Sequence, residues 1–201
     1  MKRHFTTLLA LSPFTTLAAF FDFEDRPHGL NPPTTYAGMH ITHGNVTGTV
    51  SVGSTVNWSQ TRNGVFINDN INLSWSGTKT IYTDSLEDTL IGFTTKARTV
   101  SIQSDPGSEG PDIIRLIGLK ELNTPGQYEV LTFDQAFDNE QSVAGTTLEF
   151  TFQDGVDFVI LQTTTENEAW DNLNVTPVPE PASMAALAAG IAAMLKRKRS
   201  K

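Results

Sequence analysis

The chain has 201 residues, a formal net charge of −8, 38% hydrophobic residues and no cysteine. The two ends carry 7 of the 14 Lys and Arg but only 1 of the 22 acids, so the part between them, about Phe20 to Pro177, has 21 acids against 7 bases and a net charge of −14. Such a surface repels phosphates and anionic lipid, which argues against nucleic acid as a partner and favours divalent cations. The lack of cysteine excludes disulfides and a cysteine nucleophile.

The N-terminal segment is typical of a secretory signal peptide. An apolar stretch begins at Phe5, shortly after two basic residues, and ends near the small residues Ala18 and Ala19. This order of a basic, an apolar and a small-residue region predicts export and removal of the segment. We place the signal peptide at residues 1–19, with a boundary uncertain by about two residues.

The region 20–177 reads as one domain made of β-strands. Apolar and polar residues alternate, and turn sequences such as Asp105-Pro106-Gly107 separate the alternating stretches. Strands are expected at 21–24, 50–58, 65–67, 71–75, 80–83, 90–95, 97–103, 113–119, 128–133, 147–152, 156–163 and 170–175, with a turn at 68–70. We also expect a hairpin across Gly155. About ten short strands at this spacing predict an all-β, antiparallel β-sandwich, and no stretch of this region has a convincing helical period.

The C-terminal segment, 178–201, has three parts. It begins with Val178, Pro179, Glu180 and Pro181, continues with an apolar stretch and ends in a basic cluster. The prolines favour an extended chain that presents Glu180. The apolar part favours a helix of about 21 Å, shorter than the roughly 30 Å of hydrocarbon in a bilayer, and the basic end would stay in the cytoplasm.

This three-part order resembles the PEP-CTERM sorting signal of Gram-negative bacteria. The resemblance implies recognition by an exosortase, a membrane-embedded cysteine protease, after transient insertion of the apolar helix into the inner membrane. Cleavage near Pro-Glu-Pro would send the protein to the cell surface or extracellular matrix, in connection with exopolysaccharide and biofilm. The alternatives are a plain membrane anchor, which would be longer, and a glycolipid-anchor signal, which would lack the basic end.

The order of the strands resembles the jelly-roll domains of PEP-CTERM proteins, which are similar to carbohydrate-binding modules. An acidic strand opens the domain, and Trp170–Val175 closes it. In such modules an acid of the first strand and an aspartate of the last often share a structural calcium ion, which takes six to eight oxygen ligands. The matching residues here are Asp22, Glu24, Asp171 and Asn172. The alternative interpretation is that these are solvated residues at strand ends.

Other candidate sites are weaker. His40 and His43 would point to opposite faces of a strand, which argues against zinc. The run from Asn68 to Asn72 lacks the glycine and glutamate of a calcium-binding EF-hand loop, and the acidic stretch 105–112 is typical of a solvated loop. Four aromatic residues could form a sugar-stacking platform, although such residues in alternating strands more often belong to the core: Trp58, Trp75, Tyr82 and Trp170.

Two classes of function remain. The first is a non-catalytic surface or matrix protein that binds or packs within exopolysaccharide. The second is a small secreted hydrolase or lyase that acts on glycans with the same scaffold. A jelly roll serves both, and the sequence shows no order of catalytic Ser, His and Asp and no phosphate-binding loop. The short connections favour the first class, because a catalytic sandwich usually needs long loops around a deep groove.

Overall fold

The structure, a computed structural model, describes residues 18–24, 29–31, 38–63, 65–68, 80–83, 87–104, 112–138, 146–164 and 168–179. Within these ranges it contains strands and no helix, in one compact unit that spans Ala18–Val178. The strands are β1 (Ala19–Phe21), β2 (Gly29–Asn31), β3 (Met39–Thr47), β4 (Thr55–Asn63), β5 (Val65–Asn68), β6 (Thr80–Thr83), β7 (Asp88–Ser104), β8 (Asp112–Glu121), β9 (Gln127–Asp138), β10 (Thr146–Thr163) and β11 (Glu168–Pro177).

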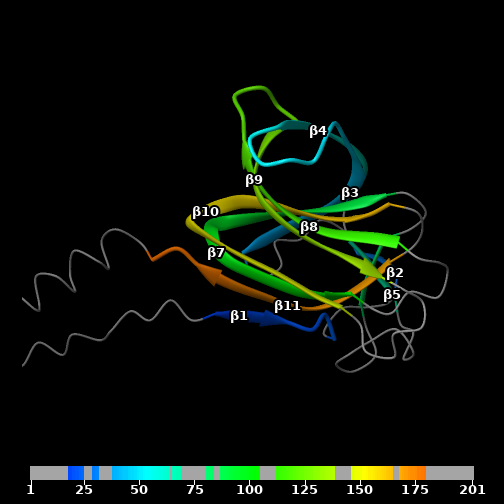
Figure 1. Ribbon diagram of the computed structural model, residues 1–201. Coiled ribbons are helices and arrows are strands. Elements are labelled where there is room, and N and C mark those ends of the chain that lie inside the picture. The colour runs from blue at the N-terminus through cyan, green and yellow to red at the C-terminus, as the bar shows by residue number, and fades with distance from the viewer. Residues whose placement is uncertain are drawn as a thin grey trace, which may run out of the picture. The chain divides into compact units, whose positions relative to one another are not determined.

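The eleven strands are hydrogen-bonded into one continuous sheet, and its two long strands, β7 and β10, take part in both of its folded parts, which we call the ring and the second sheet. The N-terminal half of β7 pairs with β3 and with the C-terminal half of β10, and its C-terminal half pairs with β11 and with the N-terminal half of β10. The antiparallel pairs β7–β3–β4–β9–β8–β10 return to β7, so these six strands form a closed ring. The second sheet continues from β7 through β11, β6 and β5 to β2, with β1 also paired to β11, as Figure 1 shows below the ring.

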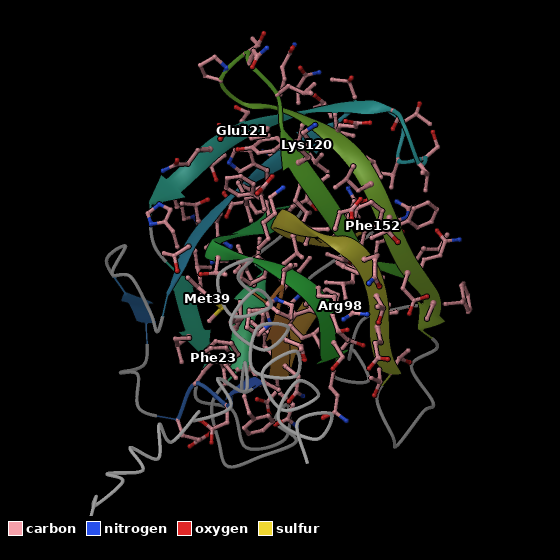
Figure 2. All side chains as sticks on the ribbon, turned by 90° about the vertical axis from the view of Figure 1, so that its left-hand side faces the viewer. Phe23, Met39, Arg98, Lys120, Glu121 and Phe152 are labelled. Atoms are coloured by element: carbon pink, nitrogen blue, oxygen red, sulfur yellow. The ribbon has the colours of Figure 1, made fainter. Side chains whose placement is uncertain are left out.

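Two apolar cores follow from this arrangement. Successive residues of β10 alternate between them: Phe158 and Ile160 face the core inside the ring, whereas Val159 and Leu161 face the core between the ring and the second sheet. Both faces of this half of β10 are therefore buried, which explains its uninterrupted apolar run. The core between the sheets also contains Phe23 and Met39, which are labelled in Figure 2.

The predicted all-β, antiparallel sandwich of jelly-roll type is confirmed, but some local expectations are wrong. The strand expected at 50–58 begins only at Thr55, because a turn closed by a 2.9 Å hydrogen bond from the amide of Ser54 to the carbonyl of Ser51 precedes it. Residues 148–152 and 158–161 do not form a hairpin, because both stretches pair with β7 and belong to one strand. Gly155 adopts a φ of 73°, and the pairing is irregular between Thr151 and Val156, so the glycine bends the strand where a turn was expected. The expected strands 90–95 and 97–103 are likewise the single strand β7.

The described chain ends next to the predicted sorting signal. The amide of Val178 donates a hydrogen bond of 2.8 Å to the carbonyl of Lys96, so the backbone stays attached to the sandwich up to this residue. Glu180, Pro181, the expected apolar helix and most of the expected signal peptide lie outside the described residues. In the part of the chain that is described, there is no helix long and apolar enough to cross a membrane.

Candidate functional site

A row of polar side chains crosses four neighbouring strands of the ring. Gln135 on β9 is paired with Arg115 on β8, and Arg115 is paired with Gln162 on β10. The pair Leu161–Thr89 fixes the register between β10 and β7, so the next position places Gln162 opposite Asp88. We call these four residues the polar row. Because residues directly opposite each other in a sheet share a face, their side chains form one continuous line.

Hydrogen bonds hold the middle of the polar row. Arg115 donates from Nε to Oε1 of Gln135 over 3.3 Å and from Nη1 to Oε1 of Gln162 over 2.8 Å. Arg115 and Gln162 are half-buried, whereas Gln135 is exposed. The two glutamines therefore fix the plane of a guanidinium group that solvent still reaches, and fixed polar groups of this kind orient a ligand at low entropic cost.

Asp88 on β7 is the last residue of the polar row, next to Gln162. Its side chain is buried, with 6% of its surface exposed, and Oδ2 accepts a hydrogen bond of 2.8 Å from the amide of Val46. Burial raises the pKa of Asp88 to about 7, although the bond from Val46, a hydrogen bond with Gln162 and the charge of Arg115 each lower it. Asp88 thus exchanges its proton near neutral pH inside the sandwich.

On β9, the residues two positions before and after Gln135 differ sharply in their exposure to solvent. On the inner side, Phe133 packs against the core inside the ring. On the outer side, the β9 residue is Phe137, which is 65% exposed and is paired with the half-buried Ile113. Phe133, Gln135 and Phe137 share a face because they alternate along β9. An exposed aromatic ring therefore lies beside fixed hydrogen-bonding groups.

This combination suits a ligand with both polar and apolar faces. A sugar ring carries hydroxyl groups that exchange hydrogen bonds with amide and guanidinium groups, and its C–H face packs on an aromatic ring. None of these residues stands out in the sequence as a candidate site residue. Arg115 and Gln162 lie within expected strands, but no local pattern indicates that they meet, because 47 positions separate them.

The aromatic residues considered from sequence do not form a platform among the described residues. Trp170 is fully buried in the core between the sheets, and Trp58 is half-buried and packs against the core inside the ring. Trp75 and the side chain of Tyr82 lie outside the described residues. The core interpretation therefore holds for the two tryptophans that the structure describes.

The two histidines do not come together. His40 is exposed, whereas His43 is buried and lies 3.1 Å from the hydroxyl of Thr89 through Nδ1. Their different environments agree with the expectation that residues three apart in a strand point to opposite faces. The acidic stretch 105–111 lies outside the described residues.

The residues expected to bind calcium lie where the first and last strands meet. β1 pairs with β11 through Phe21 and Leu173, so Asp22 and Asn172 each adjoin this pair in the chain. The strand β1 ends at Phe21, and Phe23 has a φ of 59°, so Asp22 and Glu24 occupy a turn in which Oδ1 of Asp22 accepts a 3.3 Å hydrogen bond from the amide of Glu24.

The donor atoms at this junction fit a hard cation only in part. Asp171 is fully buried, and its Oδ1 accepts a 2.7 Å hydrogen bond from the amide of Asn172. Oδ1 of Asn172 is buried and has no hydrogen-bond partner among the described residues. However, the described residues hold no group of three His, Cys, Asp or Glu side chains that could bind a metal ion. A cation at this position would therefore need amide and backbone oxygens as well as carboxylates.

Residues 177–200 match a family model described as the PEP-CTERM protein-sorting motif. This match confirms the sorting signal expected from the sequence, including Val178, Pro179, Glu180 and Pro181. It covers the C-terminal segment and leaves the sandwich without a family assignment. No curated protein matches the chain in sequence.

Several solved structures are similar to the sandwich. The K2 cleaved adhesin domain of Lys-gingipain (Kgp) matches at 11% identity with a TM-score of 0.49, over 80% of this chain and 99% of that chain. The CBM22-1 xylan-binding domain of Xyn10C from Paenibacillus barcinonensis matches at 14% identity with a TM-score of 0.39, over 77% and 99%. The family 11 carbohydrate-binding module from Clostridium thermocellum matches at 14% identity with a TM-score of 0.36, over 81% and 97%. At such identities the likeness concerns the fold alone.

Proposed function

We propose that this chain is an exported, exosortase-processed protein of the cell surface or extracellular matrix of a Gram-negative bacterium, and that its sandwich binds exopolysaccharide without cleaving it. The observation that carries the binding function is the exposed ring of Phe137 beside the polar row. The exposed ring offers a surface on which a sugar can pack, and the oriented polar groups beside it would fix the orientation of that sugar.

The end of the fold is compatible with processing at the sorting motif. The hydrogen bond between Val178 and Lys96 attaches the last residue before Pro179, so a cut near Glu180 leaves every described strand intact. In this proposal the helix of the tail inserts transiently into the inner membrane, exosortase removes it, and the signal peptide is removed separately. Mass spectrometry of the surface-released protein should find no peptide that spans Pro181 to Lys196.

Calcium is the cofactor that we propose for the junction of β1 and β11. Asp22, Glu24, Asp171 and Asn172 would supply oxygen ligands there, together with backbone carbonyls and water. The support is the pairing of Phe21 with Leu173 and the buried, unsatisfied Oδ1 of Asn172. The role would be structural, because it would connect the two ends of an acidic domain that has no disulfide.

A binding assay that also detects cleavage tests the proposal. The exported protein is incubated with a panel of bacterial exopolysaccharides, and both retention on the polymer and release of new reducing ends are measured. Retention without new reducing ends supports a binding protein. New reducing ends would establish the alternative, a glycan-active hydrolase or lyase, and the absence of both would contradict a glycan function.

A pair of phenylalanine variants locates the binding surface. Phe137→Ala should weaken retention about three- to tenfold, because stacking on an aromatic ring contributes roughly 0.5–1.5 kcal/mol. Phe20→Ala is the matched control, since Phe20 is also exposed, at 54%, but lies on β1 in the second sheet. Equal losses in both variants would show that the effect is not specific to the polar row.

A further inference from the structure

In the described part of the chain Arg115 forms no direct ion pair, although its charge acts on the carboxyl group of Asp88 at longer range. Among the described residues, Arg62 lies 3.1 Å from Glu87 and Lys96 lies 3.4 Å from Asp157, but no carboxylate lies within 4.0 Å of the Arg115 guanidinium group. Both acceptors that it contacts are neutral amide oxygens. Arg98 is also half-buried and donates to a glutamine, so what distinguishes Arg115 is that two glutamines hold its guanidinium group, in a domain with three acids for every base.

The hydrogen bonds of Arg115 leave part of the guanidinium group available. Only Nε and Nη1 donate to the two glutamines, and Nη2 has no hydrogen-bond partner in the described part of the chain. A guanidinium group carries five N–H donors in a planar fork that matches the two oxygens of a carboxylate. The glutamines hold this fork in place, so a carboxylate ligand would not have to order the side chain itself.

Phe137 provides a second contact at a suitable distance. Gln135 lies opposite Arg115, and Phe137 follows two positions later on the same face of β9. Arg115 and Phe137 are therefore diagonal neighbours on paired strands, about 7–8 Å apart, a separation across which long and aromatic side chains can contact one ligand. One sugar residue could therefore pack its C–H face on Phe137 while its carboxylate reaches Arg115.

We propose that the polar row recognises an acidic sugar, namely a uronic acid residue within a polysaccharide, whose carboxylate binds Arg115 and whose ring packs on Phe137. This inference rests on the proposed glycan-binding function and narrows it to a class of sugar. The overall negative charge of the domain opposes a polyanion at long range, but 0.15 M salt screens charges beyond about 8 Å, so a direct contact with Arg115 remains effective.

The test compares a polyuronate with the same polymer after its carboxyl groups have been reduced to alcohols. The exported protein is assayed by calorimetry in 0.15 M salt with excess chelator, because a divalent cation could bridge two acidic partners, and thermal unfolding in the same buffer confirms that the protein stays folded without calcium. We expect at least tenfold tighter binding to the polyuronate. Arg115→Gln should abolish this preference, and Arg115→Lys, which keeps the charge but not the fork, should retain only part of it.

Arg98→Gln is the matched control. Arg98, labelled in Figure 2, lies on β7 and also donates to a glutamine, from Nη2 to Oε1 of Gln153 over 2.8 Å. Its removal should leave the preference for the polyuronate unchanged. Thermal unfolding shows whether each variant is folded. If Arg115→Gln does not fold, the test rests on Arg115→Lys, whose preference for the polyuronate should be reduced.

The outcomes separate this inference from the proposed function. Equal binding to the polyuronate and the reduced polymer would overturn the acidic-sugar inference while glycan binding stands. A preference that survives in folded Arg115 variants, or that requires a divalent cation, would also overturn the role of Arg115. Failure to bind these polymers and every polysaccharide of the panel would contradict the proposed function itself.

Discussion

Phe21 in β1 lies opposite Leu173 in β11, so the first and last strands of the domain are neighbours in one sheet. Both side chains belong to the core between the sheets, where Phe21 is 6% and Leu173 0% exposed. The residues just after the expected signal peptide therefore complete the core, and Ala19, its expected last residue, is already part of β1. The two ends of the domain, Ala19 and Val178, also leave the sandwich near each other, because Ala19 is paired with Val175.

The first prediction concerns this contribution of β1 to the core. Phe21→Ala should lower the free energy of unfolding by about 3 kcal/mol or more, because truncation of a buried phenylalanine leaves a cavity. Phe20→Ala, at the adjacent exposed position, should change it by less than about 0.5 kcal/mol. Urea denaturation of both variants is the measurement. Similar losses at the two positions would mean that β1 does not pack as the structure shows.

Most strands of the sandwich could be predicted because alternation is a local property, but β3 could not, since its residues do not alternate and four in a row are buried. The expected strands 113–119, 128–133 and 170–175 correspond to β8, β9 and β11, which extend a few residues further at each end. The hairpin across Gly155 was mispredicted because a glycine between two alternating stretches indicates a turn and a bend equally well. Only the pairing of both halves of β10 with β7 distinguishes them.

The candidate site could not be predicted, because it depends on register between distant strands. Asp88 would normally be interpreted as a solvated residue before a strand, yet the fold buries it opposite Gln162. Gly118 is a similar case. A Cβ atom there would lie 2.8–2.9 Å from side-chain atoms of Phe150, Thr132 and Val156, and no local pattern indicates this close packing.

The second prediction follows from the raised pKa of Asp88. Folding raises this pKa from 3.8 to about 7, so between these values the folded state holds a proton that the unfolded chain releases. Stability should therefore fall as the pH rises from about 4 to 7, by roughly 4 kcal/mol from this group at about 1.4 kcal/mol per pKa unit. Among the described residues, the groups that act on Asp88 are Arg115, Gln162 and the amide of Val46.

Asp88→Asn removes this titration while keeping an oxygen that can accept the hydrogen bond from Val46. In urea denaturation, the free energy of unfolding of the variant minus that of the wild type should be larger at pH 8 than at pH 5. Asp154→Asn, at an exposed position, serves as the control and should leave the pH dependence unchanged. A constant difference between the Asp88 variant and the wild type at both pH values would contradict the buried, raised pKa.

The third prediction separates sorting from folding. Glu180 follows the last residues attached to the sandwich, so Glu180→Ala should block processing and leave a membrane-bound precursor without changing the midpoint of thermal unfolding. Glu121→Ala, at the exposed end of β8 labelled in Figure 2, is a control that should be processed normally. Western blots of membrane and surface fractions report the result. Normal sorting of the Glu180 variant would indicate that the tail is only an anchor.

The last prediction tests calcium at the junction of β1 and β11. An ion that binds only the folded state raises the unfolding midpoint with its concentration, and excess chelator should reverse the rise. Asp171→Ala should abolish the rise, but Asp171 is fully buried, so this variant is also expected to unfold at a lower temperature without calcium. Glu24→Gln is the milder test, because it removes one charge from the half-buried turn after β1 while keeping the shape of the side chain.

The decisive quantity is the difference in unfolding midpoint between calcium and chelator for each protein. Wild-type protein with the same midpoint in both conditions would remove the hypothesis, whereas a rise that persists in both variants would place the ion elsewhere.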